Sequence, residues 1–207
     1  MNLDAKTAKS ELTRAAIVGA GLDLVATEGL EALTLQAVAD RVGLSKSGVF
    51  SRVGSREALQ KAVIQEFGRR FLADVFTPAM QEPRGLPRLD EIVRRWLARM
   101  SRPAPNDCCI YVPGAFELDD REGALRDLLL QEVMHWRAAL RRTVLQAKEA
   151  GQLRADTDPE QLVGEIYALA IGLLHDSRFL RDPGAPARAL ASWQRLLRSY
   201  QVWTPSA

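Results

Sequence analysis

The sequence is poor in the residues that form covalent cross-links and metal sites. Its 207 residues contain two cysteines and two histidines. The cysteines, Cys108 and Cys109, are neighbours in the chain and therefore do not suit a structural disulfide. No group of His, Cys and Asp has metal-ligand spacing. We therefore expect no bound metal, no cofactor and a reducing, cytoplasmic environment.

Long hydrophobic runs are also absent. No stretch of about 18 apolar residues occurs, so the sequence predicts no membrane span. Residues 1–6 lack the apolar stretch that a secretory signal needs. Hydrophobic residues nevertheless make up 47% of the chain, which argues against disorder. The length suits one large domain or two modest ones that share a core.

Charge is nearly balanced over the whole chain but not along it. The net charge of +2 does not by itself indicate nucleic-acid binding. Residues 41–61 contain five basic residues and one acidic residue, a net charge of +4, whereas residues 1–40 carry a net charge of −3. A positive segment of this kind is what phosphate binding requires. The alternative for such a segment is a solvated helical face.

Residues 34–59 have the signals of two short helices and the start of a third, and no strand pattern of useful length occurs elsewhere. Thr34 suits the N-cap of the first helix, and Gly43 suits the left-handed residue that ends it. Ser45 can cap the second helix, Gly54 can end it, and Ser55 can cap the third. Two short helices joined by a glycine turn form a helix-turn-helix, whose second helix enters the DNA major groove.

These residues carry a resemblance to a known family. Residues 14–67 resemble the DNA-binding domain of the TetR family of transcriptional regulators, with matches at residues 16–29, 34–39, 42–50 and 55–59. The resemblance implies an all-α fold with an N-terminal three-helix helix-turn-helix DNA-binding domain and a C-terminal helical domain for effector binding and dimerisation. The segment Cys108–Asp127 also resembles the effector domain of one TetR subgroup.

Prolines and glycines mark the division of the chain. Pro78, Pro83, Gly85 and Pro87 indicate a break, so we predict a DNA-binding domain over 1–54, a connecting helix over 55–77 and a C-terminal domain over 78–207. The first helix contains two glycines, Gly19 and Gly21. The sequence does not decide whether they permit another helix to pack closely. The expected helices outside 34–54 are 11–28, 55–76, 89–100, 124–150, 158–180 and 186–200.

The recognition helix is expected over residues 45–52. Lys46 can reach a guanine edge or a phosphate, and Phe50 stands where the family commonly has tyrosine. Val25 and Val53 stand where the family often has phenylalanine, which predicts a small core. The alternative for each polar residue is an exposed turn position. The expected DNA-binding residues are Thr34, Gln36, Ser45, Lys46, Ser47, Phe50, Ser51, Arg52 and Arg56.

The resemblance further implies a homodimer that reads a palindromic operator on double-stranded DNA. The last two helices should pair with their symmetry mates, although the same residues also suit the core of a single chain. The expected interface consists of Leu162, Ile166, Leu169, Leu173, Trp193, Leu196, Leu197 and Tyr200.

A small-molecule effector is the other expected partner. Large or polar-tipped side chains outside the dimer face suit a mainly apolar or aromatic ligand, but each also suits an ordinary helical core. The candidates are Trp96, Met100, Cys108, Tyr111, Phe116, Met134, Trp136, Tyr167 and His175. The cysteines suit either a thiol sensor, which needs exposure and a lowered pKa, or burial as small hydrophobes.

The most favoured function is a ligand-responsive transcriptional regulator, with repression expected from the family. One alternative is a helical interaction module that does not bind DNA, which the near-neutral charge and Phe50 favour. The other is a small helical enzyme, which needs a nucleophile–base pair, a metal triad or a phosphate-binding glycine loop. The sequence contains none of these.

Overall fold

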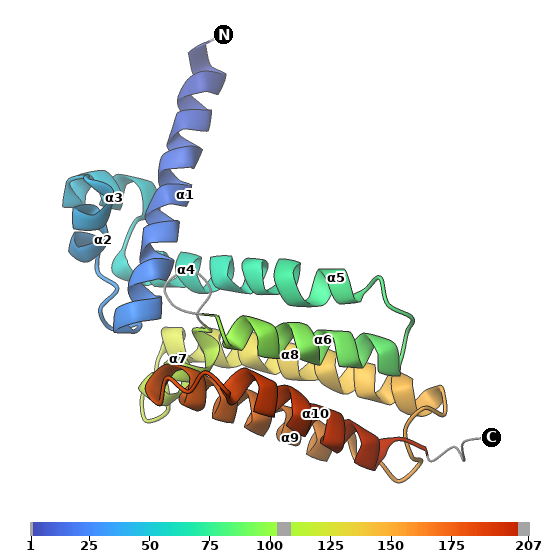
Figure 1. Ribbon diagram of the computed structural model, residues 1–207. Coiled ribbons are helices and arrows are strands. Elements are labelled where there is room, and N and C mark those ends of the chain that lie inside the picture. Colours follow the sequence, from blue (N-terminus) through green and yellow to red (C-terminus); the bar gives the residue numbers. More distant parts are fainter. Residues whose placement is uncertain (1, 103–108, 203–207) are drawn as a thin grey trace. The chain divides into compact units, whose positions relative to one another are not determined.

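The computed structural model describes residues 2–102 and 109–202, and within these residues the chain is built from helices (Figure 1). The order begins with α1 (Asn2–Glu28), α2 (Leu35–Val42), α3 (Lys46–Val53) and α4 (Arg56–Phe71). A π-helical segment, η1 (Leu72–Phe76), and a short α5 (Thr77–Ala79) follow. The remaining elements are α6 (Leu86–Met100), α7 (Tyr111–Leu118), α8 (Ala124–Glu149), α9 (Pro159–Leu174), the π-helical η2 (His175–Phe179) and α10 (Ala185–Tyr200).

The predicted helix ends of the helix-turn-helix are confirmed by their local geometry. The Thr34 hydroxyl accepts a hydrogen bond from the Ala37 N–H at 3.1 Å and so caps α2. Gly43 ends α2 with φ +67°, a left-handed conformation in which glycine lacks the Cβ penalty. The Ser45 hydroxyl accepts from the Gly48 N–H at 3.0 Å and caps α3. Sequence-local chemistry therefore determines where both short helices begin.

The described helices differ from the expected ones at several ends. The first helix starts at Asn2 and not near residue 11, because residues 2–10 contain no proline or glycine to stop it even though they lack an apolar pattern. The helix predicted over 55–76 is α-helical to residue 71 and then continues as η1. The helix predicted over 158–180 likewise ends in η2. Periodicity counted at 3.6 residues per turn does not reveal such π-helical turns.

The chain divides into two compact units. The first contains α1 to α4 up to residue 70 together with α7 and the start of α8 up to residue 132. The second contains residues 71–102 and 133–202 of the described chain. The grouping of residues 109–132 with the N-terminal helices differs from the division near residue 77 that the prolines suggested, because packing joins segments that the sequence separates.

The first unit has a core between α1, α4 and α7. Gly21 lies where an added Cβ would be 2.7 Å from a Val63 methyl, whereas the nearest group to a Cβ at Gly19 is the Arg70 side-chain tip at 3.9 Å. Gly21 is therefore the glycine that permits close approach of α1 and α4. On α7, a Cβ added at Gly114 would likewise lie 2.8 Å from a Leu30 methyl.

The second unit is a helical bundle in which α9 packs against both α6 and α10. The apolar faces of these helices are buried, and the fully enclosed side chains include Ile92, Leu140, Ile166 and Trp193. Asp158 caps α9 by accepting from the Glu160 N–H at 2.9 Å, as the sequence predicts. Within the described chain, no helix is both long enough and apolar enough to cross a membrane.

Candidate functional site

The predicted DNA-reading surface lies on α3. Ser45, Lys46 and Ser47 are exposed at its N-terminal end, and Phe50 is 56% exposed one turn further on. Val49 is fully buried on the opposite side and fixes the helix to the core. The Lys46 ammonium makes no hydrogen bond or ion pair with the described residues. The exposed end of α3 thus presents a cation, two hydroxyls and a ring to solvent.

Small polar contacts order the exposed face of α3. The hydroxyls of Ser45 and Ser47 lie 3.0 Å apart. The Ser51 hydroxyl donates to the Gly48 carbonyl at 2.9 Å and accepts from the Arg52 guanidinium at 3.0 Å. Because these partners are all local and exposed, DNA groups can replace them at little cost.

The other expected DNA-binding residues have partners within the chain. The Gln36 amide donates to Asp40 at 2.7 Å along α2. The Arg56 guanidinium donates to the main-chain carbonyls of Leu33, at 3.0 Å, and Glu31, at 2.7 Å. Arg56 therefore supports the loop before α2, and its contact with a phosphate stays a prediction.

That loop, residues 29–33, is also held from α7. The Glu117 carboxylate accepts from the main-chain N–H groups of Leu30, at 2.8 Å, and Glu31, at 2.6 Å. The Glu31 side chain forms an ion pair with Arg121, and the hydrogen bond from this guanidinium lowers the pKa of the Glu31 carboxyl. Neither Glu117 nor Arg121 has a local signal in the sequence, because their contacts join residues 86 to 90 positions apart.

Three of the ligand-binding candidates come together in the second unit. Trp96, Trp136 and Tyr167 form an aromatic cluster with Phe71 and Phe76. The Trp96 and Trp136 ring centroids are 5.3 Å apart, and those of Trp96 and Tyr167 are 4.9 Å apart. Phe71 stands edge-on to Trp136 at 4.7 Å, and Phe76 lies 6.4 Å from the same ring. We call these five residues the aromatic cluster.

The remaining candidates are not part of this cluster. Tyr111 belongs to the first unit, where its ring packs edge-on to Phe67 at 4.7 Å. Phe116 and Met134 are 64% and 53% exposed. His175 is exposed, with Nδ1 3.0 Å from an Asp176 carboxylate oxygen. Two further candidates complete the set: Met100 is buried, and Cys108 lies outside the described residues.

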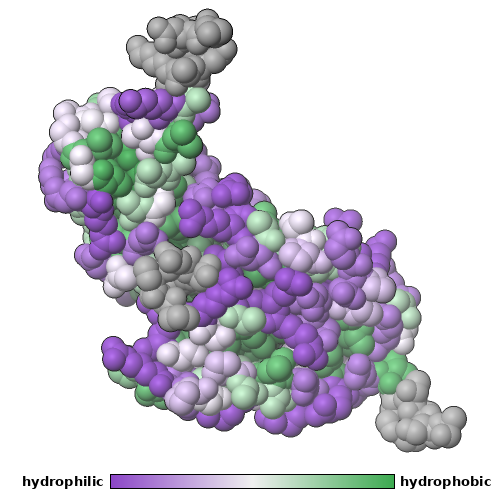
Figure 2. Space-filling model, turned by 45° about the horizontal axis from the view of Figure 1, so that its top comes forward, coloured by the Kyte–Doolittle hydropathy of each residue, from purple (hydrophilic) through white to green (hydrophobic). Residues whose placement is uncertain are grey.

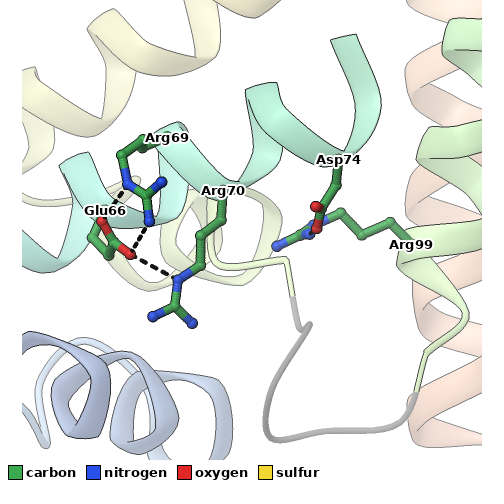
Figure 3. A network of polar contacts seen from close by, with 5 residues as sticks. All are labelled: Glu66, Arg69, Arg70, Asp74 and Arg99. Carbon is green, nitrogen blue, oxygen red and sulfur yellow. Dashed lines mark hydrogen bonds and ion pairs between the residues drawn. The ribbon is translucent and has the colours of Figure 1, made fainter. Parts of the chain in front are cut away.

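A buried cation lies beside the aromatic cluster. The Arg99 side chain is 3% exposed and forms an ion pair with Asp74 of η1 (Figure 3). Its guanidinium carbon lies 6.0 Å from the centre of the Phe71 ring. Arg99 is not among the residues predicted from the sequence. It follows Ile92 and Trp96 at helical spacing and so falls on the buried face of α6, which is the signal that could have identified it. Figure 3 also shows Glu66 between Arg69 and Arg70. The hydrogen bond from Arg69 is the main cause that lowers the Glu66 pKa to about 2.

The expected dimer residues divide into two groups. Leu162, Ile166, Leu173, Trp193 and Leu197 are buried within this chain. The half-buried members, which keep exposed surface, are Leu169, Leu196 and Tyr200.

Between α9 and α10 lies an open groove of about 760 Å³. Its lining includes the small residues Ala168, Gly172 and Ala189 and the charged residues Glu165 and Arg195. On the face drawn in Figure 2, hydrophilic side chains cover most of the surface and hydrophobic ones emerge in separate patches.

The comparison with protein families decides the identity of the chain. Residues 17–63 match the model described as bacterial regulatory proteins of the tetR family. Residues 85–193, more than half of the chain, match the tetracyclin repressor-like C-terminal domain. The chain belongs to the TetR family. As a TetR-family protein it is a DNA-binding transcriptional regulator and not an enzyme.

Solved structures of TetR-family regulators share the fold. A regulator from Chloroflexus aurantiacus is 20% identical, with a TM-score of 0.80 over 93% of this chain and 98% of that one. A regulator from Cytophaga hutchinsonii is 20% identical, with a TM-score of 0.78 over 95% and 98% of the two chains. A regulator from Saccharomonospora viridis in complex with choline is 14% identical, with a TM-score of 0.76 over 94% and 100%. No curated protein matches the chain.

Proposed function

We propose that this TetR-family protein is a repressor that binds a palindromic operator as a homodimer and is released by a small, mainly apolar or aromatic effector. The observation that carries the DNA-binding part is the exposed N-terminal end of α3, where Ser45, Lys46 and Ser47 face solvent above the buried Val49. In a helix-turn-helix, this end of the second helix contacts base edges. The net charge of +4 over residues 41–61 supplies attraction to phosphates.

The test of DNA binding is an anisotropy titration of the full chain against the DNA that flanks its own gene, at several salt concentrations. Lys46→Ala should weaken binding and reduce the slope of log affinity against log salt by about 1, the value expected for one lost phosphate contact. If Lys46 contacts a base, the loss is instead largest on the preferred sequence.

Lys9→Ala is the matched control, because Lys9 is exposed on α1 and its removal lowers the net charge by the same amount. The control should bind like the natural chain. Equal, weak binding of the natural chain to every duplex would refute the proposal that the protein represses through an operator in this DNA.

The homodimer is proposed to form across the α9–α10 groove. The small residues Ala168 and Gly172 line the groove, so a helix of a second copy can approach closely, and a Cβ added at Gly172 would meet nothing within 4 Å beyond the nearby backbone of its own helix. Acidic Glu165 and Asp176 and basic Arg188 and Arg195 line the groove. A two-fold axis would place acidic groups of one copy near basic groups of the other.

Sedimentation equilibrium tests this interface. Ala168→Arg adds a large charged side chain to an exposed position in the groove, so it should shift the protein to monomers. Ala138→Arg, at an exposed position on α8, should leave the association unchanged. An unchanged dimer in the Ala168 variant would exclude this groove as the interface.

The effector is proposed to bind in the second unit, at the aromatic cluster. The support is the convergence of large rings from η1, α6, α8 and α9 on one buried position. Aromatic walls with a few polar groups are typical of small-molecule sites. Release of operator DNA on addition of an effector is the expected readout.

A further inference from the structure

The aromatic cluster contains two buried donors without acceptors. Trp96 and Trp136 are 2% and 5% exposed, and neither indole N–H has a hydrogen-bond partner among the described residues. The third described tryptophan, Trp193, is also fully buried, but its indole N–H donates to the Asp90 carboxylate at 2.7 Å. The described residues therefore supply an acceptor for one buried indole and none for the two in the cluster.

Packing within the cluster does not replace the missing acceptors. The Trp96 and Trp136 rings meet edge to face, with an interplanar angle of 87°, and a ring face is the only acceptor that one indole can offer the other. An N–H to ring contact is much weaker than a hydrogen bond to oxygen. Buried tryptophan N–H groups usually have a partner, so two orphaned donors on adjoining rings point to an acceptor that comes from outside the chain.

The surroundings of the two indoles are rich in positive charge. Arg99 is buried beside the Phe71 ring, where Asp74 is its ion-pair partner. The Arg137 guanidinium lies over the Tyr167 ring, 4.5 Å from its centre. Two guanidinium groups therefore lie against rings of the cluster, and positive charge favours an electron-rich oxygen over a cation.

A second, independent feature marks the same place. Asp74 and Phe76 both belong to η1, the π-helical segment that follows α4. Short π-helical turns are rare in proteins as a whole, and those that occur often lie at functional sites. In this turn, Asp74 and Phe76 lie at the cluster. If residues 72–76 were purely α-helical, these two side chains would point in other directions.

We propose that the aromatic cluster binds a planar, unsaturated ligand whose carbonyl or carboxylate oxygen accepts hydrogen bonds from the Trp96 and Trp136 indoles. The rings of Phe71 and Tyr167 contact the ligand's apolar body, and Arg99 attracts its oxygen. The proposal rests on the proposed function, since it names the chemical class of the effector. Because the two N–H groups are enclosed, binding requires the rings to move apart.

The first experiment compares probes on the full-length protein by isothermal titration calorimetry. The probes are 2-acetonaphthone and 2-naphthoate, which carry an acceptor oxygen, and 2-ethylnaphthalene, which has a similar apolar body without one. Both oxygen-bearing probes should bind at least tenfold more tightly than the hydrocarbon. A larger advantage for 2-naphthoate than for the ketone would assign a role to the charge near Arg99. Equal affinities for all three probes, or no binding of either oxygen-bearing probe, would overturn the proposal.

The second experiment removes the donors and keeps the rings. Trp96→Phe and Trp136→Phe should each reduce affinity for 2-acetonaphthone about five- to tenfold, the loss of one neutral hydrogen bond, and leave 2-ethylnaphthalene within twofold. Trp193→Phe is the matched control: it removes a partnered indole elsewhere in the same unit and should leave the preference for oxygen-bearing probes intact. Circular dichroism confirms that each variant is folded. If both cluster variants keep the full preference, the indoles do not donate to the ligand.

Operator binding without any probe is measured on the same preparations. Normal probe selectivity with no sequence-specific DNA binding would refute the proposed regulator and leave the ligand class standing. Specific DNA binding with no probe selectivity would refute the proposed ligand class and leave the proposed regulator standing.

Discussion

Replacing Glu117 with alanine removes both acceptors that hold the loop of residues 29–33 from α7. The Leu30 and Glu31 main-chain N–H groups, which lie 2.8 and 2.6 Å from the Glu117 carboxylate oxygens, then lose their partners. The loop leads directly to Thr34, the N-cap of α2. We therefore expect the variant to loosen the entry to the helix-turn-helix while the helices themselves persist.

The size of the effect follows from the geometry. A hydrogen bond to a charged acceptor contributes about 1.5–3 kcal/mol when it is buried. The bond from Leu30 is part-buried and the bond from Glu31 is exposed, so water recovers much of the loss. We expect Glu117→Ala to lower the free energy of unfolding by about 1.5–3 kcal/mol in total, and Glu117→Gln, which keeps one acceptor oxygen, by about half of that.

Amide hydrogen exchange measures the local opening of the loop, and urea denaturation measures the free energy of unfolding. Exchange at the Leu30 and Glu31 amides should accelerate about tenfold for each 1.4 kcal/mol lost locally. Glu122→Ala is the control, because Glu122 is an exposed carboxylate in the connection between α7 and α8. If Glu117→Ala and Glu122→Ala have the same urea midpoint and the same exchange at these amides, Glu117 does not support the loop.

Two further predictions concern stability. The folded-state pKa of Glu66 is depressed from 4.5 to about 2, chiefly by the hydrogen bond from Arg69. Its contribution to stability is therefore present above pH 4.5 and is lost as the pH falls toward 2. Glu66→Gln should cost about 1 kcal/mol at pH 6 after solvent screening, and thermal melts of the two proteins should converge near pH 2, whereas a difference independent of pH would refute the ion pair. Gly114→Ala places a methyl 2.8 Å from a Leu30 methyl in the core and should destabilise by about 1–2 kcal/mol. Gly19→Ala, whose added methyl would meet only the Arg70 side-chain tip at 3.9 Å, should stabilise by about 0.5–1 kcal/mol. Chemical denaturation that shows the same sign for both would contradict the packing described.

The sequence predicted much of the helical framework because the signals are local. The caps at Thr34 and Ser45 and the left-handed Gly43 act over three or four residues, and the structure confirms each of them. The start of α9 at Asp158 and Pro159 is of the same kind. These signals place the helix-turn-helix, and with it the expected reading surface of α3, without any knowledge of the tertiary fold.

The candidate ligand site was predicted only in part. Trp96, Trp136 and Tyr167 were selected for their size, and the structure brings their rings together. Phe116 and Met134 met the same criterion but are exposed. Size and polarity identify residues that can line a pocket. The helix face on which each residue lies, and what packs against that face, decides which of them come together.

The sequence by itself determined the helix-turn-helix, the caps of its helices and the positive charge along it, because these depend on neighbours in the chain. Only the tertiary structure decided that Glu117 holds a loop 86 residues away, that Arg99 is buried against an aromatic cluster and that two tryptophans there have no acceptor among the described residues. The physical reason is that burial and pairing are properties of the packed chain: the same glutamate or arginine is a solvated surface charge or a buried partner according to what the fold places beside it.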